Sequence, residues 1–590
     1  MQRETLPTSR IKIILLGFYL IYLLVVFRLI KLQLIDHKKY TSDAENQYGN
    51  LQIINPKRGN IYSSEGFVLA GTSTHYLLYA EPKKVVNRYD TARRVAEVLS
   101  SGGVEYEKYE DYYRDKINNS LNLDLLWVVL ERNISPVKKE EIEGLEIKGL
   151  GFEEEPARYY PEGSLAAHVL GYVAQNESGE KTGYYGVEGM LNEDLKGKPG
   201  RVIQDVDAMG IPILSGKYKK VDPIQGRDVY LTIDRSIQYI VEKKIKEGVE
   251  KYNALSGSVI VMNPFTGDVL AMANFPTYSP GNFLEEETHL PDSDRKNIER
   301  VNFSVSRTFE PGSVIKPVTI AAGIDLHLIN PNTTFYDNGP VQYSDYTIDN
   351  WDGKHHGAQT VIQLLQKSNN IGAAWVGHQV GSKNLHDYMD AFGLGRITEI
   401  ELEGENTGIL HDYKDWTDID LATISFGQGI SATSLQVLNA FNVIANGGYL
   451  LQPRIIKEIH EVDDVIEIPT KNLGRVINTE TSATMIKLLE EAASGGEAKY
   501  FILKNYRIAG KTGTAQIPDE KGGYYEDKTN ATFVGFVARS KKFSMIVNLQ
   551  EPKASIYASE TAVPLWMEIT QELVKSFGLP PDRADLENLE

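Results

Sequence analysis

A charge-free apolar run close to the start of the chain places the strongest constraint on its fold. The run covers residues 13–27, with Lys12 before it and Arg28 after it. With a few flanking residues it reaches the ~20 residues that a helix needs to cross a bilayer, and the two cations can extend to the headgroups. The sequence therefore predicts a transmembrane anchor at residues 11–34, preceded by a polar lead at residues 1–10.

A cleaved signal peptide is the alternative interpretation of the same run. Such a peptide ends in a site of small residues, whereas this run continues into Arg28-Leu29-Ile30-Lys31-Leu32-Gln33. We therefore expect the segment to stay attached as an anchor. The positive-inside rule leaves its orientation open, because lysine and arginine residues lie on both sides of it.

Length and composition set further limits. At 590 residues the chain is too long for one domain, which favours two or three domains besides the anchor. Lys and Arg number 62 against 80 Asp and Glu, and the net charge of -18 argues against a nucleic-acid partner. Cysteine is absent, so disulfides and a cysteine nucleophile are excluded. The adjacent His355 and His356 suit chelation of a metal ion poorly, and we expect them to lie in a solvated loop.

The segment Phe309-Glu310-Pro311-Gly312-Ser313-Val314-Ile315-Lys316 has the features of a turn that leads into a buried helix. Pro311-Gly312 breaks regular structure, and residues 314–326 are mostly apolar. Residues three apart share a helix face, so Ser313 and Lys316 would point the same way. A desolvated lysine loses part of its preference for charge and could take the proton of the hydroxyl. The alternative is an N-cap serine followed by a solvated lysine.

Two further motifs follow along the chain. Ser368-Asn369-Asn370 lies in the middle of residues 360–377, which we predict to be one helix although these three residues are poor helix formers. A local conflict of this kind is typical of a functional site. Lys511-Thr512-Gly513-Thr514 lies in an extended segment, where Gly510 and Gly513 leave room for a ligand backbone.

Taken in order, Ser-x-x-Lys, Ser-x-Asn and Lys-Thr-Gly form the motif set of penicillin-binding proteins and serine β-lactamases. The chain resembles a class B penicillin-binding protein, a membrane-anchored peptidoglycan transpeptidase. The resemblance implies an α/β (α+β) fold with a single N-terminal transmembrane helix, a mixed α+β pedestal, and a transpeptidase domain whose central antiparallel sheet is flanked by helices. It implies a cytoplasmic lead (1–10), an anchor (11–34), a non-catalytic, dimerisation-like pedestal (35–226), a transpeptidase domain (227–578) and an acidic tail (579–590).

The resemblance also implies roles for the catalytic residues. Ser313 would attack the penultimate D-Ala carbonyl of a peptidoglycan stem, with Lys316 as the base. Ser368 would relay a proton to the leaving amine, while Lys511 keeps the local potential positive. Asn370 would hold the substrate amide. The resemblance implies that no metal ion or organic cofactor is needed.

The third motif would bind substrate. Thr512 and Thr514 would bind the substrate carboxylate, with Gly513 beside them. Backbone N–H groups of Ser313 and Thr514 would form an oxyanion hole, where each donor is typically worth ~3 kcal/mol. β-Lactams would mimic the dipeptide and trap Ser313.

The remaining expectations concern location, partners and alternatives. The resemblance implies a single-pass protein of the plasma membrane, with its N-terminus in the cytoplasm and its catalytic domain outside. Expected partners are stem peptides, lipid II-derived glycan strands, β-lactams, a SEDS-type glycosyltransferase and divisome membrane proteins. A septal role is favoured by residues 309–312 and 425–431, which look like the division type. The alternatives are an elongation-type transpeptidase, a β-lactamase or D,D-carboxypeptidase, and a non-catalytic division scaffold.

One decoy precedes the nucleophile. Lys181-Thr182-Gly183 repeats the third motif but is followed by Tyr184 and lies among loop residues, so we predict a turn. His168 is predicted to be a packed or hydrogen-bonded residue, because no second ligand cluster accompanies it.

Overall fold

The computed structural model describes residues 8–40, 49–101, 106–205, 218–281, 300–343, 346–461, 464–519 and 521–582. The chain divides into two compact units. The first unit consists of Met1–Lys57 and Gly197–Gly226, and the second of Arg58–Lys196 and Arg227–Glu590. The tail expected at residues 579–590 lies largely outside the described residues.

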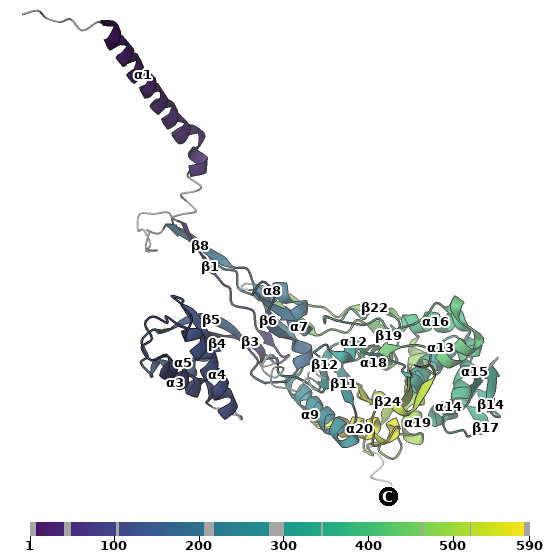
Figure 1. Cartoon of the computed structure of the whole chain (residues 1–590). Coiled ribbons are helices and arrows are strands. Elements are labelled where there is room, and N and C mark those ends of the chain that lie inside the picture. Colours follow the sequence, from purple (N-terminus) through teal and green to yellow (C-terminus); the bar gives the residue numbers. More distant parts are fainter. Residues whose placement is uncertain are drawn as a thin grey trace, which may run out of the picture. The chain divides into compact units, whose positions relative to one another are not determined.

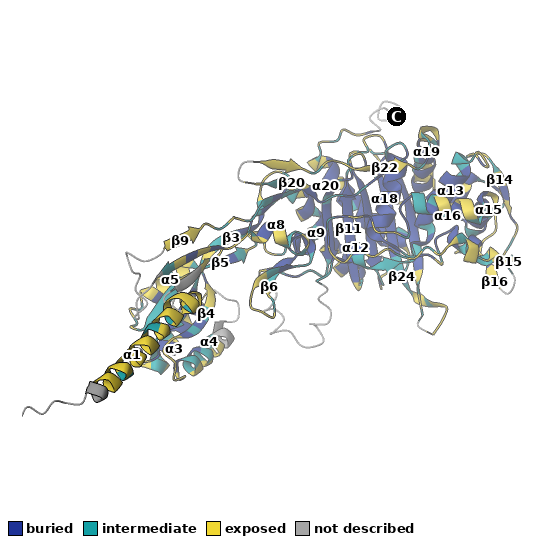
Figure 2. Cartoon of the chain, turned by 90° about the horizontal axis from the view of Figure 1, so that it is seen from above, coloured by how far each residue is buried: buried dark blue, intermediate teal, exposed yellow. Residues whose placement is uncertain are grey.

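The first unit contains the apolar run and a small sheet. Helix α1 (Thr8–Ile30) continues into a short π-helical turn at Lys31–Ile35, and Ile11–Ile35 is long and apolar enough to cross a membrane. Its large apolar side chains are exposed along the helix, as the yellow ribbon in Figure 2 shows. A continuous exposed apolar surface of this kind suits lipid rather than water. Strands β1 (Gly49–Ile54), β8 (Gly200–Asp205) and β9 (Tyr218–Val221) form an antiparallel sheet.

The second unit begins with a sheet that joins distant parts of the chain. Strand β3 is long, and it pairs with β2 at Val68 and Ala70, with β5 along Gly71–Ala80 and with β4 between Tyr76 and Ala80. Strand β10 pairs parallel with β2 and antiparallel with β20, so strands from before residue 160 and from beyond residue 227 share one sheet. The strands are β2 (Ile61–Tyr62), β3 (Val68–Ala80), β4 (Val128–Ile134), β5 (Leu150–Tyr159), β10 (Asp228–Leu231), β20 (Ile456–His460) and β21 (Val465–Glu467).

Three helices cover the part of this sheet built from β3, β4 and β5. They are α3 (Arg88–Ser100), α4 (Tyr106–Leu121) and α5 (Pro136–Glu143). Helix α5 starts where Ser135 accepts a hydrogen bond from the Lys138 N–H and proline occupies the first turn, which are ordinary start signals. Buried Leu78, Val95, Ile117 and Leu130 fill the space between the helices and the sheet.

The decoy motif lies in a strand and not in the predicted turn. Strand β7 (Lys181–Tyr184) pairs with β6 (Tyr172–Gln175), and the rings of Tyr172 and Tyr184 stack at 5.7 Å. The turn prediction was wrong because cross-strand pairing supplied partners that local composition does not reveal. Short helices α6 (Ala167–Leu170), α7 (Gly186–Met190) and α8 (Asn192–Lys196) surround this hairpin.

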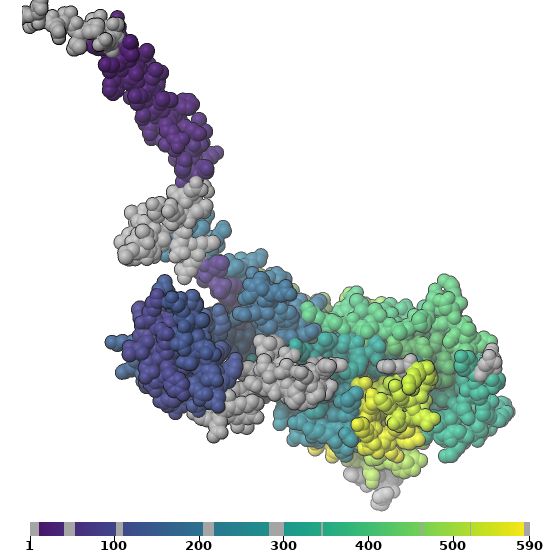
Figure 3. Space-filling view, viewed as in Figure 1, coloured from purple at the N-terminus to yellow at the C-terminus, as the bar shows by residue number. Residues whose placement is uncertain are grey.

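The central sheet of the second unit has the strand order β12-β11-β25-β24-β23 and is antiparallel throughout. Val259 and Val261 contribute to the core beneath α9 and α20, whereas Ile260 and Met262 join the core beneath α18, as the two-residue period of a strand requires. The chain's yellow C-terminal segment lies against teal segments near residue 250 (Figures 1 and 3). The elements are β11 (Ser256–Met262), β12 (Val269–Phe275), β23 (Ile508–Pro518), β24 (Tyr524–Val537), β25 (Ser544–Gln550), α9 (Arg235–Tyr252), α18 (Ser434–Ala445) and α20 (Ala562–Ser576).

Further helices and hairpins complete this unit and carry most of the site. The helices are α12 (Phe303–Ser306), α13 (Lys316–Asp325), α14 (Val361–Lys367), α15 (Asn370–Val380), α16 (Ser382–Ala391), α17 (Asp418–Ile424) and α19 (Thr479–Gly495). The paired strands are β13 (Thr308–Phe309) with β18 (Ala432–Thr433), β14 (Thr334–Asp337) with β17 (Gly357–Thr360), β15 (Val341–Tyr343) with β16 (Tyr346–Ile348), and β19 (Tyr449–Leu451) with β22 (Asn472–Arg475). The predicted fold class, with helices on an antiparallel sheet, is confirmed.

Candidate active site

Ser313 lies in a tight turn that two backbone contacts hold in place. It belongs to a 3-10 turn, Gly312–Ile315, and α13 begins directly afterwards at Lys316. Gly312 has a φ of +57° and its N–H donates to the Gly427 carbonyl at 2.9 Å. A Cβ on Gly427 would lie 2.1 Å from the Gly312 carbonyl oxygen, so the two backbones touch. Ser313 itself is half-buried, while its neighbours in the turn are buried.

Lys316 is a fully buried lysine at the first position of α13. Its Nζ donates to the Ser368 hydroxyl at 3.2 Å and to the Asn370 amide oxygen at 2.8 Å, and it also contacts the Ser368 carbonyl. Burial, followed by the charge of Lys511, lowers the pKa of Lys316 well below its ordinary value. A lowered pKa favours the neutral amine, which is the form that a general base needs.

Ser368 breaks the helix that was predicted across residues 360–377. It has a φ of +54° in the left-handed region, so α14 ends at Lys367 and α15 begins at Asn370. The single-helix prediction was wrong because Asn369 caps α15, accepting from the Gly372 N–H at 2.6 Å, and buried partners hold the break. The resulting turn directs the Ser368 hydroxyl to both site lysines.

Lys511 reaches the same hydroxyl from the sheet. It is 3% exposed on β23, and its Nζ donates to Ser368 Oγ and to Thr512 Oγ1, each at 3.0 Å. Burial lowers the pKa of Lys511, and the charge of Glu497 opposes this effect. The structure thus brings Lys316, Ser368, Asn370 and Lys511 together from three separate elements.

Strand β23 runs directly against the Ser313 turn. A Cβ on Gly513 would lie 2.9 Å from Val314 Cγ1 and 3.0 Å from the Pro311 carbonyl oxygen, so this close approach needs glycine. Two threonines on this strand, Thr512 and Thr514, differ in how far they are buried. Thr514 is half-buried and its hydroxyl accepts from the Ala558 N–H at 3.0 Å, which leaves the hydroxyl proton available.

The hydroxyl of Thr512, in contrast, is already engaged by a carboxylate of the protein. Thr512 is 4% exposed and donates to Glu497 Oε2 at 2.6 Å. A hydroxyl has one proton to donate, so this bond leaves Thr512 without a donor for a ligand. Of the two threonines predicted to bind a carboxylate, the geometry favours Thr514.

Sequence reasoning missed two acidic residues next to the motifs. Asp337 is buried and accepts from the side-chain amides of Asn369 at 2.7 Å and Asn350 at 2.9 Å, which supports the turn at Ser368. Glu497 follows α19 and contacts Thr512. Neither carboxylate stands in a motif or at a spacing that singles it out. His168 is buried against Tyr278 and Phe303, as predicted for a packed residue.

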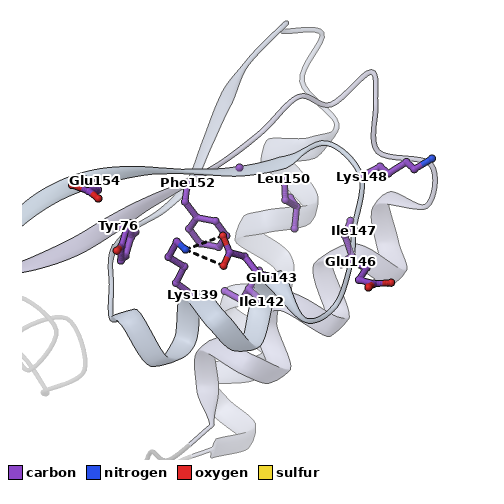
Figure 4. Close-up of a pocket in the computed structure, with 11 residues that line it drawn as sticks. Tyr76, Lys139, Ile142, Glu143, Glu146, Ile147, Lys148, Leu150, Phe152 and Glu154 are labelled. Carbon is purple, nitrogen blue, oxygen red and sulfur yellow. Dashed lines mark hydrogen bonds and ion pairs between the residues drawn. The ribbon is translucent and has the colours of Figure 1, made fainter.

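A separate hollow lies in the part of the second unit that contains α5 and β5. It has a volume of about 550 Å³, and Lys139 pairs there with Glu143 at 2.9 Å beside Tyr76 and Phe152 (Figure 4). Its lining contains two lysines, Lys139 and Lys148, but no serine or threonine that could act as a nucleophile. Among the described residues there is also no cluster of three His, Asp or Glu side chains suited to a metal ion. The chemistry therefore points to the motif site.

Two buried lysines that share one serine hydroxyl, beside a second serine in a tight turn, define the penicillin-reactive class of serine acyltransferases. Comparisons with known proteins agree. Residues 257–571 match the family model described as the penicillin binding protein transpeptidase domain, and residues 53–231 match the penicillin-binding protein dimerisation domain. The chain belongs to the class B penicillin-binding proteins, which are serine D,D-transpeptidases.

Individual relatives resemble nearly the whole chain. Stage V sporulation protein D of Bacillus subtilis (strain 168) is 30% identical over 587 residues, covering 98% of this chain and 87% of that protein. The peptidoglycan D,D-transpeptidase FtsI of Buchnera aphidicola subsp. Baizongia pistaciae is 30% identical over 584 residues, covering 97% and 96%. The crystal structure of penicillin binding protein 2X from Streptococcus thermophilus is 26% identical, with a TM-score of 0.72, covering 89% and 80%.

Proposed function

We propose that this transpeptidase cross-links peptidoglycan stem peptides through an acyl-enzyme at Ser313. The observation that carries the proposal is the convergence of Lys316 and Lys511 on the Ser368 hydroxyl, next to the turn that holds Ser313. A relative named a peptidoglycan D,D-transpeptidase, similar over 97% of this chain, supports the substrate class.

In the first half-reaction, Ser313 Oγ attacks the carbonyl carbon of the penultimate D-Ala and gives its proton to neutral Lys316. The N–H groups of Ser313 and Thr514 stabilise the oxyanion. The C–N bond then breaks, and the proton passes through Ser368 to the departing D-Ala amine. Lys511 stays protonated and keeps the potential positive, Asn370 holds the substrate amide, and the terminal carboxylate binds at Thr514.

In the second half-reaction, an amine from a neighbouring stem attacks the ester carbon. The amine loses a proton to the lysine–serine pair, the C–Oγ bond breaks, and Ser313 recovers its proton. No step needs a metal ion or an organic cofactor. β-Lactams would enter the same cycle and stop at the acyl-enzyme. This is supported by a solved structure at 25% identity and a TM-score of 0.67, penicillin binding protein 3 of Mycobacterium tuberculosis complexed with aztreonam.

Labelling with fluorescent penicillin tests this proposal against its rivals. Long-lived label on the wild-type chain and none on Ser313→Ala supports the transpeptidase. Rapid loss of label would indicate a β-lactamase or carboxypeptidase that uses water as acceptor, and no label on wild type would indicate a scaffold.

We further propose that α1 anchors the protein in the plasma membrane, with the N-terminus in the cytoplasm and residues 227–578 outside. The pedestal at residues 35–226 would space the enzyme from the membrane and contact a SEDS-type glycosyltransferase and divisome proteins. Protease added to intact spheroplasts should degrade the bulk of the chain and spare an N-terminal tag. Degradation of the tag alone would contradict this orientation.

A septal role is the proposed cellular function, supported by the FtsI relatives. A sporulation role is a second candidate, because the relative named stage V sporulation protein D covers 98% of the chain. Depletion that produces filaments supports septal synthesis, depletion that rounds the cells supports an elongation role, and loss of spores with normal growth supports sporulation.

A further inference from the structure

We propose that Glu497 is a positioning residue of this active site, which orients the Lys511 ammonium toward Ser368 through the hydroxyl of Thr512. The inference rests on the proposed acyl-enzyme chemistry and adds a residue that lies outside the three motifs. Glu497 lies just after the end of α19 at Gly495. The Lys511 side chain on β23 is therefore linked both to Ser368, between α14 and α15, and to the segment after α19.

The Thr512 hydroxyl has a single proton, and this fixes the direction of its hydrogen bonds to Glu497 and Lys511. Thr512 Oγ1 lies 2.6 Å from Glu497 Oε2 and 3.0 Å from Lys511 Nζ. A carboxylate can only accept and an ammonium can only donate, so the hydroxyl gives its single proton to Glu497 and turns a lone pair to Lys511. Both bonds include a charged partner, which makes them short and strong.

The surroundings of Glu497 strengthen this chain of hydrogen bonds. Beside it lies a cavity of about 10 Å³, room for roughly one water molecule. Its lining includes Leu365, Ala493 and Phe533 together with Lys511 and Thr512. Charges act on one another more strongly in such poorly hydrated surroundings than at the surface.

Glu497 also helps the two buried lysines to differ in charge. The base Lys316 must be neutral to accept a proton, whereas Lys511 must keep its charge. Glu497 connects to Lys511 through one hydroxyl, whereas the contacts of Lys316 are with Ser368 and Asn370. The charge of Glu497 raises the pKa of Lys511 and, as a lesser effect than burial and Lys511, that of Lys316. The hydrogen-bond network thus contains three charged or titratable groups, Lys316, Lys511 and Glu497, which are linked by the neutral hydroxyls of Ser368 and Thr512.

The test is the rate constant for acylation of the full-length protein in detergent by fluorescent penicillin, measured from pH 5 to 10. Glu497→Gln keeps an acceptor for Thr512 and removes the charge, so both lysines should lose protons at lower pH. We expect the alkaline limb of the plot of acylation rate constant against pH to shift to lower pH by about one unit. The rate constant should be about tenfold lower at pH 9 and unchanged at pH 6. Thr512→Val, which breaks the connection but keeps the carboxylate, should move the same limb in the same direction.

Glu491→Gln, on the exposed part of α19, is the matched control and should reproduce the wild-type profile. Partial misfolding lowers the fraction of molecules labelled but does not shift the alkaline limb of the pH profile. Either that result or an unchanged pH profile for Glu497→Gln would overturn the proposal. Failure of the wild-type chain to label at all would instead sink the proposed function.

Discussion

Lys316 and Lys511 donate to the same oxygen, Ser368 Oγ, at 3.2 Å and 3.0 Å. The first lysine begins a helix and the second lies on a strand, and both are buried. Two ammonium groups this close repel each other, and burial favours the loss of a proton. The pair is therefore suited to hold one proton fewer than two isolated lysines would, which gives the site a base and a cation side by side.

Replacement of Lys316 should remove the base. We expect Lys316→Ala to lower the acylation rate constant by about 10²–10⁴-fold, the range typical of general bases. Lys316→Arg should fall as far, because a guanidinium does not give up its proton near neutral pH. Stopped-flow labelling with fluorescent penicillin measures both. Acylation of Lys316→Arg at the wild-type rate would show that charge, and not proton transfer, is what the site needs.

Two substitutions at Ser368 separate its hydroxyl from its backbone conformation. Both Ser368→Ala and Ser368→Gly lose an acceptor for two buried lysines, so acylation should fall by about 10- to 100-fold in each. Only glycine adopts a φ of +54° without cost, so Ser368→Gly should be more stable than Ser368→Ala by about 1 kcal/mol. Thermal unfolding followed beside acylation checks both parts. Equal stability of the two variants would argue against the left-handed turn.

Gly427→Ala tests the contact that holds the nucleophile turn. The new Cβ would meet the Gly312 carbonyl oxygen at 2.1 Å, and the φ of +89° would add strain. We expect a loss of stability of at least ~2 kcal/mol together with a loss of labelling. Gly281→Ala is the control, because its nearest neighbour is the Tyr160 ring at 3.8 Å, and it should change stability by less than about 0.5 kcal/mol.

Glu242 on α9 should make stability depend on pH. Burial raises its pKa to about 7, although it accepts from the Ala166 N–H at 2.6 Å and from Gln238 at 2.8 Å. A carboxyl whose pKa is raised on folding contributes stability that is complete below its unfolded value near 4.5 and is lost as the pH rises through 7. Between pH 5 and 8 this loss should be on the order of 2 kcal/mol.

Glu242→Gln keeps both acceptor bonds and removes the titration. Its melting temperature should exceed that of the wild type at pH 8, with little difference at pH 5. Glu247→Gln, on the exposed side of the same helix, serves as the control and should leave the pH dependence of melting unchanged. Parallel melting curves for Glu242→Gln and the wild type would contradict this assignment.

The parts of the fold predicted from sequence are those with local signals. Helix α9 runs from Arg235 to Tyr252 because Asp234 caps its start and Asn253 takes a left-handed conformation at its end. The hairpin of β11 and β12 follows from two short apolar runs, residues 259–262 and 269–273, on either side of the turn at Gly267. The structure also places one residue from each motif in contact, because Lys316 and Lys511 both donate to Ser368.

Other features depend on contacts that sequence reasoning could not see. The left-handed Ser368 is held by Lys316, and Asp337 holds the neighbouring Asn369, although Asp337 lies more than thirty positions away. The same is true of Glu497, whose partner Thr512 lies on a different element. Tertiary partners of this kind override helix propensity at Ser368 and occupy the hydroxyl of Thr512.

The most direct test of the account is to locate the acyl group. The full-length protein would be acylated with a β-lactam, digested and analysed by mass spectrometry. We expect the adduct on the peptide that contains Ser313, at one adduct per chain, and no adduct in Ser313→Ala. An adduct on any other residue, or an unmodified Ser313 peptide after saturating treatment, would contradict the assignment of the nucleophile.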